Sequence, residues 1–235
     1  MIRKILFTLA AFLPILAMAQ LQHDIYTTPM GRLIVTPINH ASVMLQIRGK
    51  VIYIDPYELN VDFSTLPKAD LILITHEHPD HLDGKALRKI TLPDTYIIAT
   101  EKVSASGLPK ASIMYNGDLA SWNDIEIEAV PAYNLVHKQA NGQPYHVKGV
   151  GNGYIISFGS FRIYIAGDTE DIPEMANLGK INIAFLPKNL PYTMDDAQFI
   201  RAAKMVNPKV LYPYHYSEIN RTYLRSQLPK TIELK

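Results

Sequence analysis

Three histidines and an aspartate that could bind a metal ion together lie within six consecutive residues, His76-Glu77-His78-Pro79-Asp80-His81. Imidazoles and a carboxylate are the nitrogen and oxygen ligands that Zn²⁺ and related divalent cations take in proteins. Clustered imidazoles repel one another when protonated, so the cluster gains stability from a shared partner. A solvated polar loop is the alternative, and it suits a lone histidine better than this run. The spacing therefore predicts a metal site with His76, His78, Asp80 and His81 as ligands.

The residues before this run predict how it is positioned. Residues 71–74 are uninterrupted aliphatic residues, typical of a strand buried on both faces. While the chain stays extended, His76 and His78 project to the same side. Pro79 lacks an N–H and is expected to stop the strand, so Asp80 and His81 follow in a turn. The ligands are thus expected at the carboxyl end of a central strand.

Strand-forming segments recur along the rest of the chain. β-Branched and aliphatic residues predict strands over 33–36, 42–47, 51–55, 95–100, 125–130, 154–158, 161–166, 181–186 and 210–212. Helices are expected over 81–90, 101–106, 195–206 and 221–228, with Asp195 or Thr193 capping the third. Both halves begin with strands and end with helices, as in a distant internal repeat. This pattern fits two mixed sheets packed face to face with helices outside, although other layered α/β folds stay open.

Composition limits the kind of protein and the kind of site. In 235 residues, 48% are hydrophobic and 19% charged, a globular balance that argues against disorder. The formal net charge of +1 gives no basic surplus for nucleic acid or anionic lipid. The chain has no cysteine, which excludes disulfides and thiolate ligands. A metal would therefore be held by His, Asp or Glu.

The first residues have the pattern of a secretory signal peptide. Arg3 and Lys4 precede the apolar residues 5–16, and Ala17-Met18-Ala19 offers a cleavage site. The apolar run is short of the ~20 residues that span a bilayer. We expect residues 1–19 to be removed and residues 20–235 to form one domain without a stable membrane anchor. Cleavage changes the net charge from +1 to −1, and the mature protein is expected in the periplasm or outside the cell.

Two further candidates come directly after strands. Asp168 follows Gly167, whose flexible backbone lets the chain turn sharply. His215 ends the segment 210–216. Taken alone, Asp168 could cap a helix and His215 could be a core or interface residue.

The metal-binding run resembles the signature motif of the metallo-β-lactamase superfamily. The segments 40–43, 54–56, 130–134, 164–169 and 191–194 are similar to the ascorbate-phosphate-lactonase-like branch of Zn-dependent hydrolases. The resemblance implies the four-layer αββα sandwich of α/β (α+β) class. It also implies that Asp168, in Gly167-Asp168-Thr169, bridges two metals and that His215 binds the second.

The chain departs from the superfamily pattern at the third histidine. The superfamily usually has a histidine just after the strand that here ends at Val130, and Asn134 occupies that position. His146 precedes Lys148-Gly149, as in similar sequences, so we expect it to complete the site. His137 is the alternative. Both lie in a Gly-rich loop over 134–153.

These residues predict a hydrolase with two divalent cations, Zn²⁺ in the first place and Mn²⁺ as an alternative. His76, His78 and His146 would hold one, and Asp80, His81 and His215 the other. A hydroxide between them would attack a small-molecule lactone, ester, amide or phosphate ester, and Asp80 would orient it. Asp55 is expected to fix a histidine tautomer, and Asn134 and Tyr192 to line the pocket. A metal-binding or partner-binding module without turnover is the alternative function, and the sequence leaves the oligomeric state open.

Overall fold

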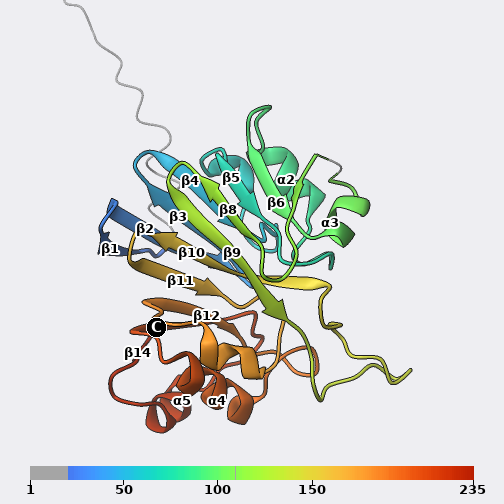
Figure 1. The fold of residues 1–235 in the computed structure, drawn as a ribbon, viewed down its shortest axis with the longest axis vertical. Helices are drawn as coiled ribbons and strands as arrows, with labels where there is room; N and C mark the ends of the chain where they lie inside the picture. Colours follow the sequence, from blue (N-terminus) through green and yellow to red (C-terminus); the bar gives the residue numbers. More distant parts are fainter. Residues whose placement is uncertain (1–20, 109) are drawn as a thin grey trace, which may run out of the picture.

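The structure is a computed structural model that describes residues 21–108 and 110–235, so the expected signal peptide lies outside the described residues. Two seven-stranded sheets form its centre (Figure 1). The first contains, in spatial order, β1 (Asp24–Thr28), β2 (Gly31–Asn39), β3 (Ser42–Ile47), β4 (Lys50–Ile54), β5 (Leu71–Leu73), β6 (Tyr96–Ala99) and β7 (Ser112–Ile113). The second contains β8 (Leu119–Trp122), β9 (Ile125–Ala132), β10 (Gly151–Phe158), β11 (Phe161–Ile165), β12 (Ile183–Pro187), β13 (Val210–Tyr214) and β14 (Glu233–Leu234).

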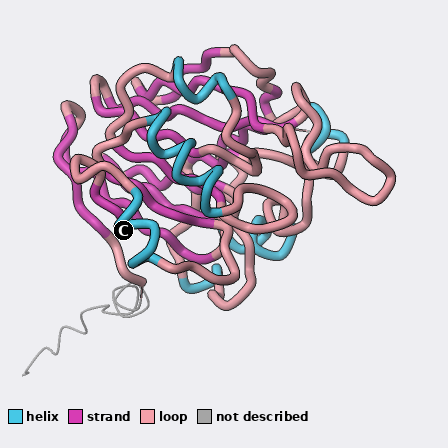
Figure 2. The backbone as a smooth tube through the Cα atoms, turned by 90° about the horizontal axis from the view of Figure 1, so that it is seen from below, coloured by secondary structure: helices cyan, strands magenta, loops and turns pink. Residues whose placement is uncertain are grey.

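Helices cover the outer face of each sheet (Figures 1 and 2). The first sheet carries η1 (Phe63–Thr65), α2 (Gly84–Ile90) and α3 (Glu101–Ala105), and the second carries η2 (Pro173–Asn177), α4 (Asp196–Val206) and α5 (Arg221–Gln227). One hydrophobic cluster lies between the sheets, with Leu45 and Ile156 among its members. Two others lie between each sheet and its helices. These three cores separate four layers, so the αββα sandwich expected from the sequence is confirmed.

The strand directions bring several strand ends to one edge. Within each sheet the first four strands pair antiparallel, and the last four pair parallel. As a result β2, β4 and β5 run in one direction in the first sheet, and β9, β11, β12 and β13 share a direction in the second. The carboxyl ends of parallel strands are where open α/β sheets bind ligands. The two sheets repeat one strand plan, as the two halves of the sequence suggested.

Two boundaries near the metal-binding run differ from the sequence prediction. The strand ends at Leu73 as β5, before the histidines, and the helix begins at Gly84 and not at residue 81. The ladder stops because the Thr75 N–H donates to the Asp55 carboxylate at 2.8 Å, and not to a neighbouring strand. The helix starts late because Asp83 is its N-cap and accepts from the Lys85 N–H. The run is therefore a turn held by side chains.

The sequence prediction also missed four strands, namely β1, β7, β8 and β14. All four lie at sheet edges, and β7 and β14 pair over only two residues each. Short edge strands carry little hydrophobic pattern because neighbours cover them on one side only. The predicted cap of α4 is confirmed, since Asp195 and Gln198 form a reciprocal capping box. None of the helices in the described ranges has the length and apolar character needed to cross a bilayer.

Candidate metal centre

Three imidazoles meet at one side of the shared strand edge. His76 and His78 come from the turn after β5, and His146 comes from the long loop between β9 and β10. His78 Nδ1 lies 3.1 Å from His76 Nε2 and 3.3 Å from His146 Nε2. Three nitrogens this close, all turned inward, form a group that could hold a metal ion. The structure thus brings together the first ligand set expected from the sequence.

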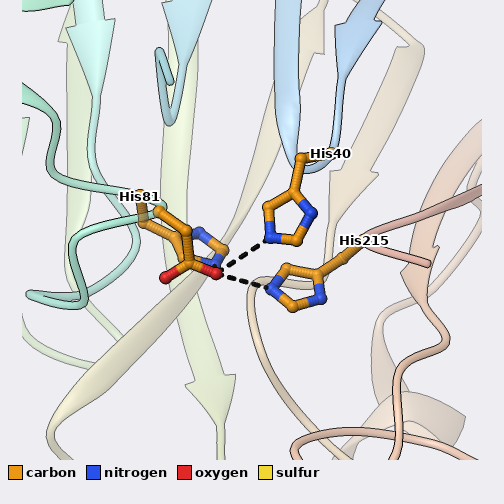
Figure 3. Close-up of side chains that lie close together, drawn as sticks. His40, His81 and His215 are labelled. Atoms are coloured by element: carbon orange, nitrogen blue, oxygen red, sulfur yellow. Dashed lines mark hydrogen bonds and ion pairs between the residues drawn. The ribbon is translucent and has the colours of Figure 1, made fainter. Parts of the chain in front are cut away.

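A second group lies beside the first. His81 follows His78 in the same turn, and His215 follows β13. Asp80 Oδ2 lies 3.2 Å from His215 Nε2 and 3.8 Å from His81 Nε2. Figure 3 shows dashed lines from a carboxylate oxygen, which is that of Asp80, to the rings of His215 and His40. The second expected set is therefore also brought together.

Asp168 lies between the two groups. Its Oδ2 is 3.4 Å from His146 Nε2 in the first group and 3.3 Å from His215 Nε2 in the second. Its Oδ1 is 3.4 Å from His81 Nε2. The side chain is buried, so this carboxylate faces the imidazoles and not solvent. Its position is the one that the resemblance implied for a bridging ligand.

A glycine makes room for this carboxylate. Gly167 has φ +66°, a left-handed conformation that favours glycine. A Cβ added there would lie 2.8 Å from the Asn152 carbonyl oxygen. The chain can therefore turn sharply after β11, pass close to β10 and direct Asp168 into the site.

Buried polar contacts orient the imidazoles from behind. Asp55, fully buried after β4, lies 2.8 Å from His81 Nδ1 and accepts from Thr75 Oγ1 at 2.6 Å. Thr75 Oγ1 also lies 2.9 Å from His76 Nδ1. A carboxylate behind a ligand histidine fixes its tautomer and leaves Nε2 free for the metal. Asp55 therefore lies next to the ligand candidates, in contact with His81 directly and with His76 through Thr75.

The pKa shifts favour the ionisation states in which these side chains bind cations. Burial lowers the pKa of His76 well below its usual value and that of His146 to about 4, so both imidazoles are neutral at pH 7. Burial acts to raise the pKa of Asp80 and of Asp168, but the facing histidines outweigh it and hold both below the usual range. Burial acts to lower the pKa of His81, but Asp168 and Asp55 raise it well above 6.5. Metal binding at the second group would therefore displace a proton from His81.

The donors present fit divalent cations. His81 Nε2 and Asp168 Oδ1 are buried, and neither makes a hydrogen bond among the described residues. Buried polar atoms without a partner are costly unless a bound group satisfies them. The five imidazoles and two carboxylates described above give nitrogen and oxygen donors and no thiolate, a set typical of Zn²⁺ and Mn²⁺. His76, His78 and His146 would hold one ion, Asp80, His81 and His215 the other, and Asp168 both.

The two histidines of the long loop have different positions. His146 faces the site, whereas His137 Nδ1 lies 2.7 Å from the carboxylate of Glu170. Asn134 is next to His146: its Oδ1 accepts from the His146 backbone N–H at 2.9 Å and lies 2.7 Å from His146 Nδ1. The asparagine in the usual histidine position therefore contacts a ligand candidate from behind.

Sequence reasoning missed two residues here. His40, at the turn after β2, has its Nε2 2.8 Å from Asp80 Oδ2 (Figure 3), and Glu170 lies beneath the long loop. The resemblance included the segment 40–43, but nothing in it marked His40 as part of the site. Glu170 is one of four acids in residues 168–174, and nothing in the sequence distinguishes it from the others. No spacing signal could have indicated either one.

A cavity of about 470 Å³ opens over the two groups. His78, Asp80, Asp168 and His215 lie on its inner side. Its walls are Pro79, Gln139, Tyr145, His146, Asn189 and Tyr192, so Tyr192 lines the cavity as expected. The rings of Tyr145 and Tyr192 meet edge to face with centroids 5.1 Å apart. The cavity is large enough for a small molecule.

Comparisons with known proteins agree with this geometry. A family model for the beta-lactamase superfamily domain matches residues 35–215. A UPF0173 metal-dependent hydrolase of Caldivirga maquilingensis is 30% identical over 194 residues, covering 77% of this chain and 80% of the relative. One of Archaeoglobus fulgidus is 31% identical over 194 residues, with 78% and 83% covered.

Solved structures of metal-dependent hydrolases are also similar to this chain. A candidate metal-dependent hydrolase of Parabacteroides distasonis matches with a TM-score of 0.86 and 45% identity, covering 92% of this chain and 97% of that one. Igni18, a metallo hydrolase of Ignicoccus hospitalis, matches in fold with a TM-score of 0.67, 23% identity and 86% and 93% of the two chains covered.

Proposed function

This chain belongs to the metallo-β-lactamase superfamily and is a metal-dependent hydrolase of that fold, and we propose that it works with two divalent cations. The observation that carries the proposal is the position of Asp168, within 3.4 Å of imidazoles from both ligand groups. A carboxylate shared by two sets of histidines suits a pair of ions better than one. Zn²⁺ is the ion we expect first, and Mn²⁺ is the alternative.

The protein's own residues would place and activate the reacting groups. Divalent cations held by these residues would lower the pKa of a bound water toward 7 and polarise the attacked oxygen of the substrate. Asp80 is partly exposed to the cavity, so its carboxylate can orient the attacking water and take its proton. The neighbouring Tyr145 and Tyr192 would hold the substrate against the site.

The cavity walls favour a carbonyl substrate over a phosphate ester. Among the described residues that line the 470 Å³ cavity there is no lysine or arginine. An adjoining cavity of about 230 Å³ contains Lys102, but this lysine pairs with Glu77. Phosphate-binding sites usually supply such cations. We therefore place lactones, esters and amides before phosphate esters.

We also propose that the mature protein is exported and begins after Ala19. The support is the order of basic, apolar and small residues at the start of the sequence. N-terminal sequencing of the protein from the cell envelope or medium tests this. A chain retained in the cytosol with residue 1 intact would contradict it.

The function is tested by metal removal and a substrate panel. We expect a chelator to abolish turnover of at least one lactone, ester or amide, and Zn²⁺ or Mn²⁺ to restore it, with two ions bound per chain. The alternative, a binding module without turnover, was suggested by Asn134 in the histidine position, and it loses support because His146 faces the site. Stoichiometric metal with no turnover of any lactone, ester, amide, lactam or phosphodiester would restore it.

A further inference from the structure

Glu170 is a completely buried carboxylate that clamps the long loop between β9 and β10. It is 0% exposed. Oε2 accepts from the backbone N–H groups of Leu135 and Val136 at 2.8 and 2.7 Å, and Oε1 accepts from that of His137 at 2.7 Å. Successive backbone N–H groups that converge in this way form an anion-binding nest. The start of the loop is thus folded around one side chain.

The same carboxylate fixes the amide of Asn134. Asn134 Nδ2 donates to Glu170 Oε1 at 3.1 Å and to the Tyr192 carbonyl at 2.9 Å, while Oδ1 accepts from the His146 backbone N–H. A carboxylate and a carbonyl only accept, and a backbone N–H only donates. The amide therefore has one possible orientation.

This orientation sets the tautomer of His146. Asn134 Oδ1 lies 2.7 Å from His146 Nδ1, and an amide oxygen can only accept, so Nδ1 carries the hydrogen. Nε2 then has a free lone pair, and it is the nitrogen that lies 3.3 Å from His78 Nδ1 and 3.4 Å from Asp168 Oδ2. This is the form that binds a metal.

Glu170 also belongs to the loop that carries Asp168. Its backbone N–H donates to the Tyr133 carbonyl at 3.0 Å, and the Tyr133 N–H donates to Thr169 Oγ1 at 3.1 Å. Residues 168–170 and 133–137 are therefore joined by backbone and side chain together. One segment thus provides the carboxylate between the ligand groups and the support for a ligand from another loop.

We propose that Glu170 is a positioning residue for the first metal site, acting through Asn134. It holds the Asn134 amide, and the amide holds His146 in place with Nε2 free. The same amide fixes the Tyr192 carbonyl in the cavity wall. This inference rests on the proposed function, because it takes His146 to be a metal ligand.

Metal titration of Glu170→Gln tests the proposal, with Zn²⁺ alone as the probe and a competing chromophoric chelator. We expect one of the two dissociation constants to rise about 10- to 100-fold and the other to change little. Glu174→Gln is the matched control, because the Glu174 carboxylate accepts from Tyr133 Oη and Lys148 Nζ and not from the Asn134 amide. Its two constants should stay within about twofold of the wild-type values.

A second readout needs no metal. In ¹⁵N spectra of the metal-free protein, wild-type His146 should be the Nδ1–H tautomer, and Glu170→Gln should give a mixture. Asn134→Ala leaves the backbone N–H groups that donate to Glu170 intact and should also give a mixture of His146 tautomers. This variant tests the proposal if Glu170→Gln does not fold. The double variant Asn134→Asp with Glu170→Gln removes the repulsion between two buried carboxylates that Asn134→Asp alone creates, and it should recover part of the metal affinity lost in Asn134→Asp.

The possible results distinguish a failure of the proposed function from a failure of the proposed role of Glu170. Wild-type protein that binds no metal would overturn the proposed function. Wild-type protein that binds two ions, with unchanged constants and tautomer in Glu170→Gln and Asn134→Ala, would overturn only the role of Glu170. Equal weakening of both sites would also overturn it, because a general structural role predicts that result.

Discussion

His40 Nε2 lies 2.8 Å from Asp80 Oδ2, and the His40 carbonyl accepts the His215 N–H at 2.8 Å. A single residue at the end of β2 therefore touches two members of the second ligand group from a different segment of the chain (Figure 3). Its ring packs on that of His215 with centroids 3.9 Å apart. His40 completes the group of donors around the second site.

Replacing His40 should impair turnover more than folding. We expect His40→Ala to lower kcat about 10- to 100-fold, because Asp80 loses the contact that orients it. His40→Gln can still donate to Asp80 and should recover much of the loss. Steady-state kinetics with metal analysis provides the measurement, and His23→Ala, an exposed histidine, is the control. Wild-type kcat in His40→Ala would show that the contact is dispensable.

Replacing each histidine of the long loop with alanine should show which of the two binds a metal ion. His146→Ala is expected to lose one metal ion per chain, since its Nε2 faces the first group. His137→Ala should keep two, because its ring faces Glu170 and not the site. Elemental analysis after dialysis gives the count. Two ions in His146→Ala would remove it from the ligand set.

Removing Asp55 should weaken both metal binding and the fold. Asp55→Ala leaves His81 Nδ1 and the Thr75 N–H buried without their acceptor. We expect a loss of about 3–5 kcal/mol in the free energy of unfolding and about 10- to 100-fold weaker metal binding. Denaturant titration and metal competition measure these. Asp94→Ala, at an exposed position outside the ion pairs and side-chain hydrogen bonds of the described residues, should change neither by much. Unchanged metal affinity in Asp55→Ala would argue against a supporting role.

A single methyl group at Gly167 should disturb the site without touching a ligand. In Gly167→Ala the new Cβ would meet the Asn152 carbonyl oxygen at 2.8 Å, in addition to the strain of a positive φ. We expect at least about 2 kcal/mol of destabilisation and a lower metal content. Gly142→Ala is the matched control, since its φ is +84° and its Cβ would meet nothing within 4 Å. Equal effects of the two variants on metal content would contradict the steric argument.

His146 should make the metal-free protein less stable as the solution becomes mildly acidic. The pKa of His146 is about 4 in the folded protein, against 6.5 for a free imidazole. The unfolded chain therefore binds this proton more readily, so the free energy of unfolding falls as pH drops from 6.5 through 4. The full shift corresponds to about 3 kcal/mol. In urea titrations between pH 7 and 4, the free energy of unfolding of His146→Asn should fall less steeply with decreasing pH than that of the wild-type protein. If the two free energies fall in parallel, protonation of His146 is not a cause of the lost stability.

The sequence alone predicted most of the fold and most of the site. The run from His76 to His81 could be found from its spacing and its position after an aliphatic strand. Asp168 and His215 also follow strands, but they were expected to be ligands because of the resemblance to the metallo-β-lactamase superfamily. The choice between His137 and His146 could not be derived from local pattern, because the loop between them is shaped by Glu170. His40 escaped notice for a similar reason: its role depends on Asp80, which is 40 residues away along the chain.

The shared plan of the two sheets has a consequence for assembly. β1–β7 provide His40 and the run from His76 to His81, whereas β8–β14 provide His146, Asp168 and His215. Neither group of donors is complete within one sheet. Ions bound by these groups would therefore take ligands from both sheets and hold the two sheets together. Fragments split at the connection between β7 and β8 should associate more tightly in the presence of Zn²⁺ than in its absence, a form of metal-driven complementation.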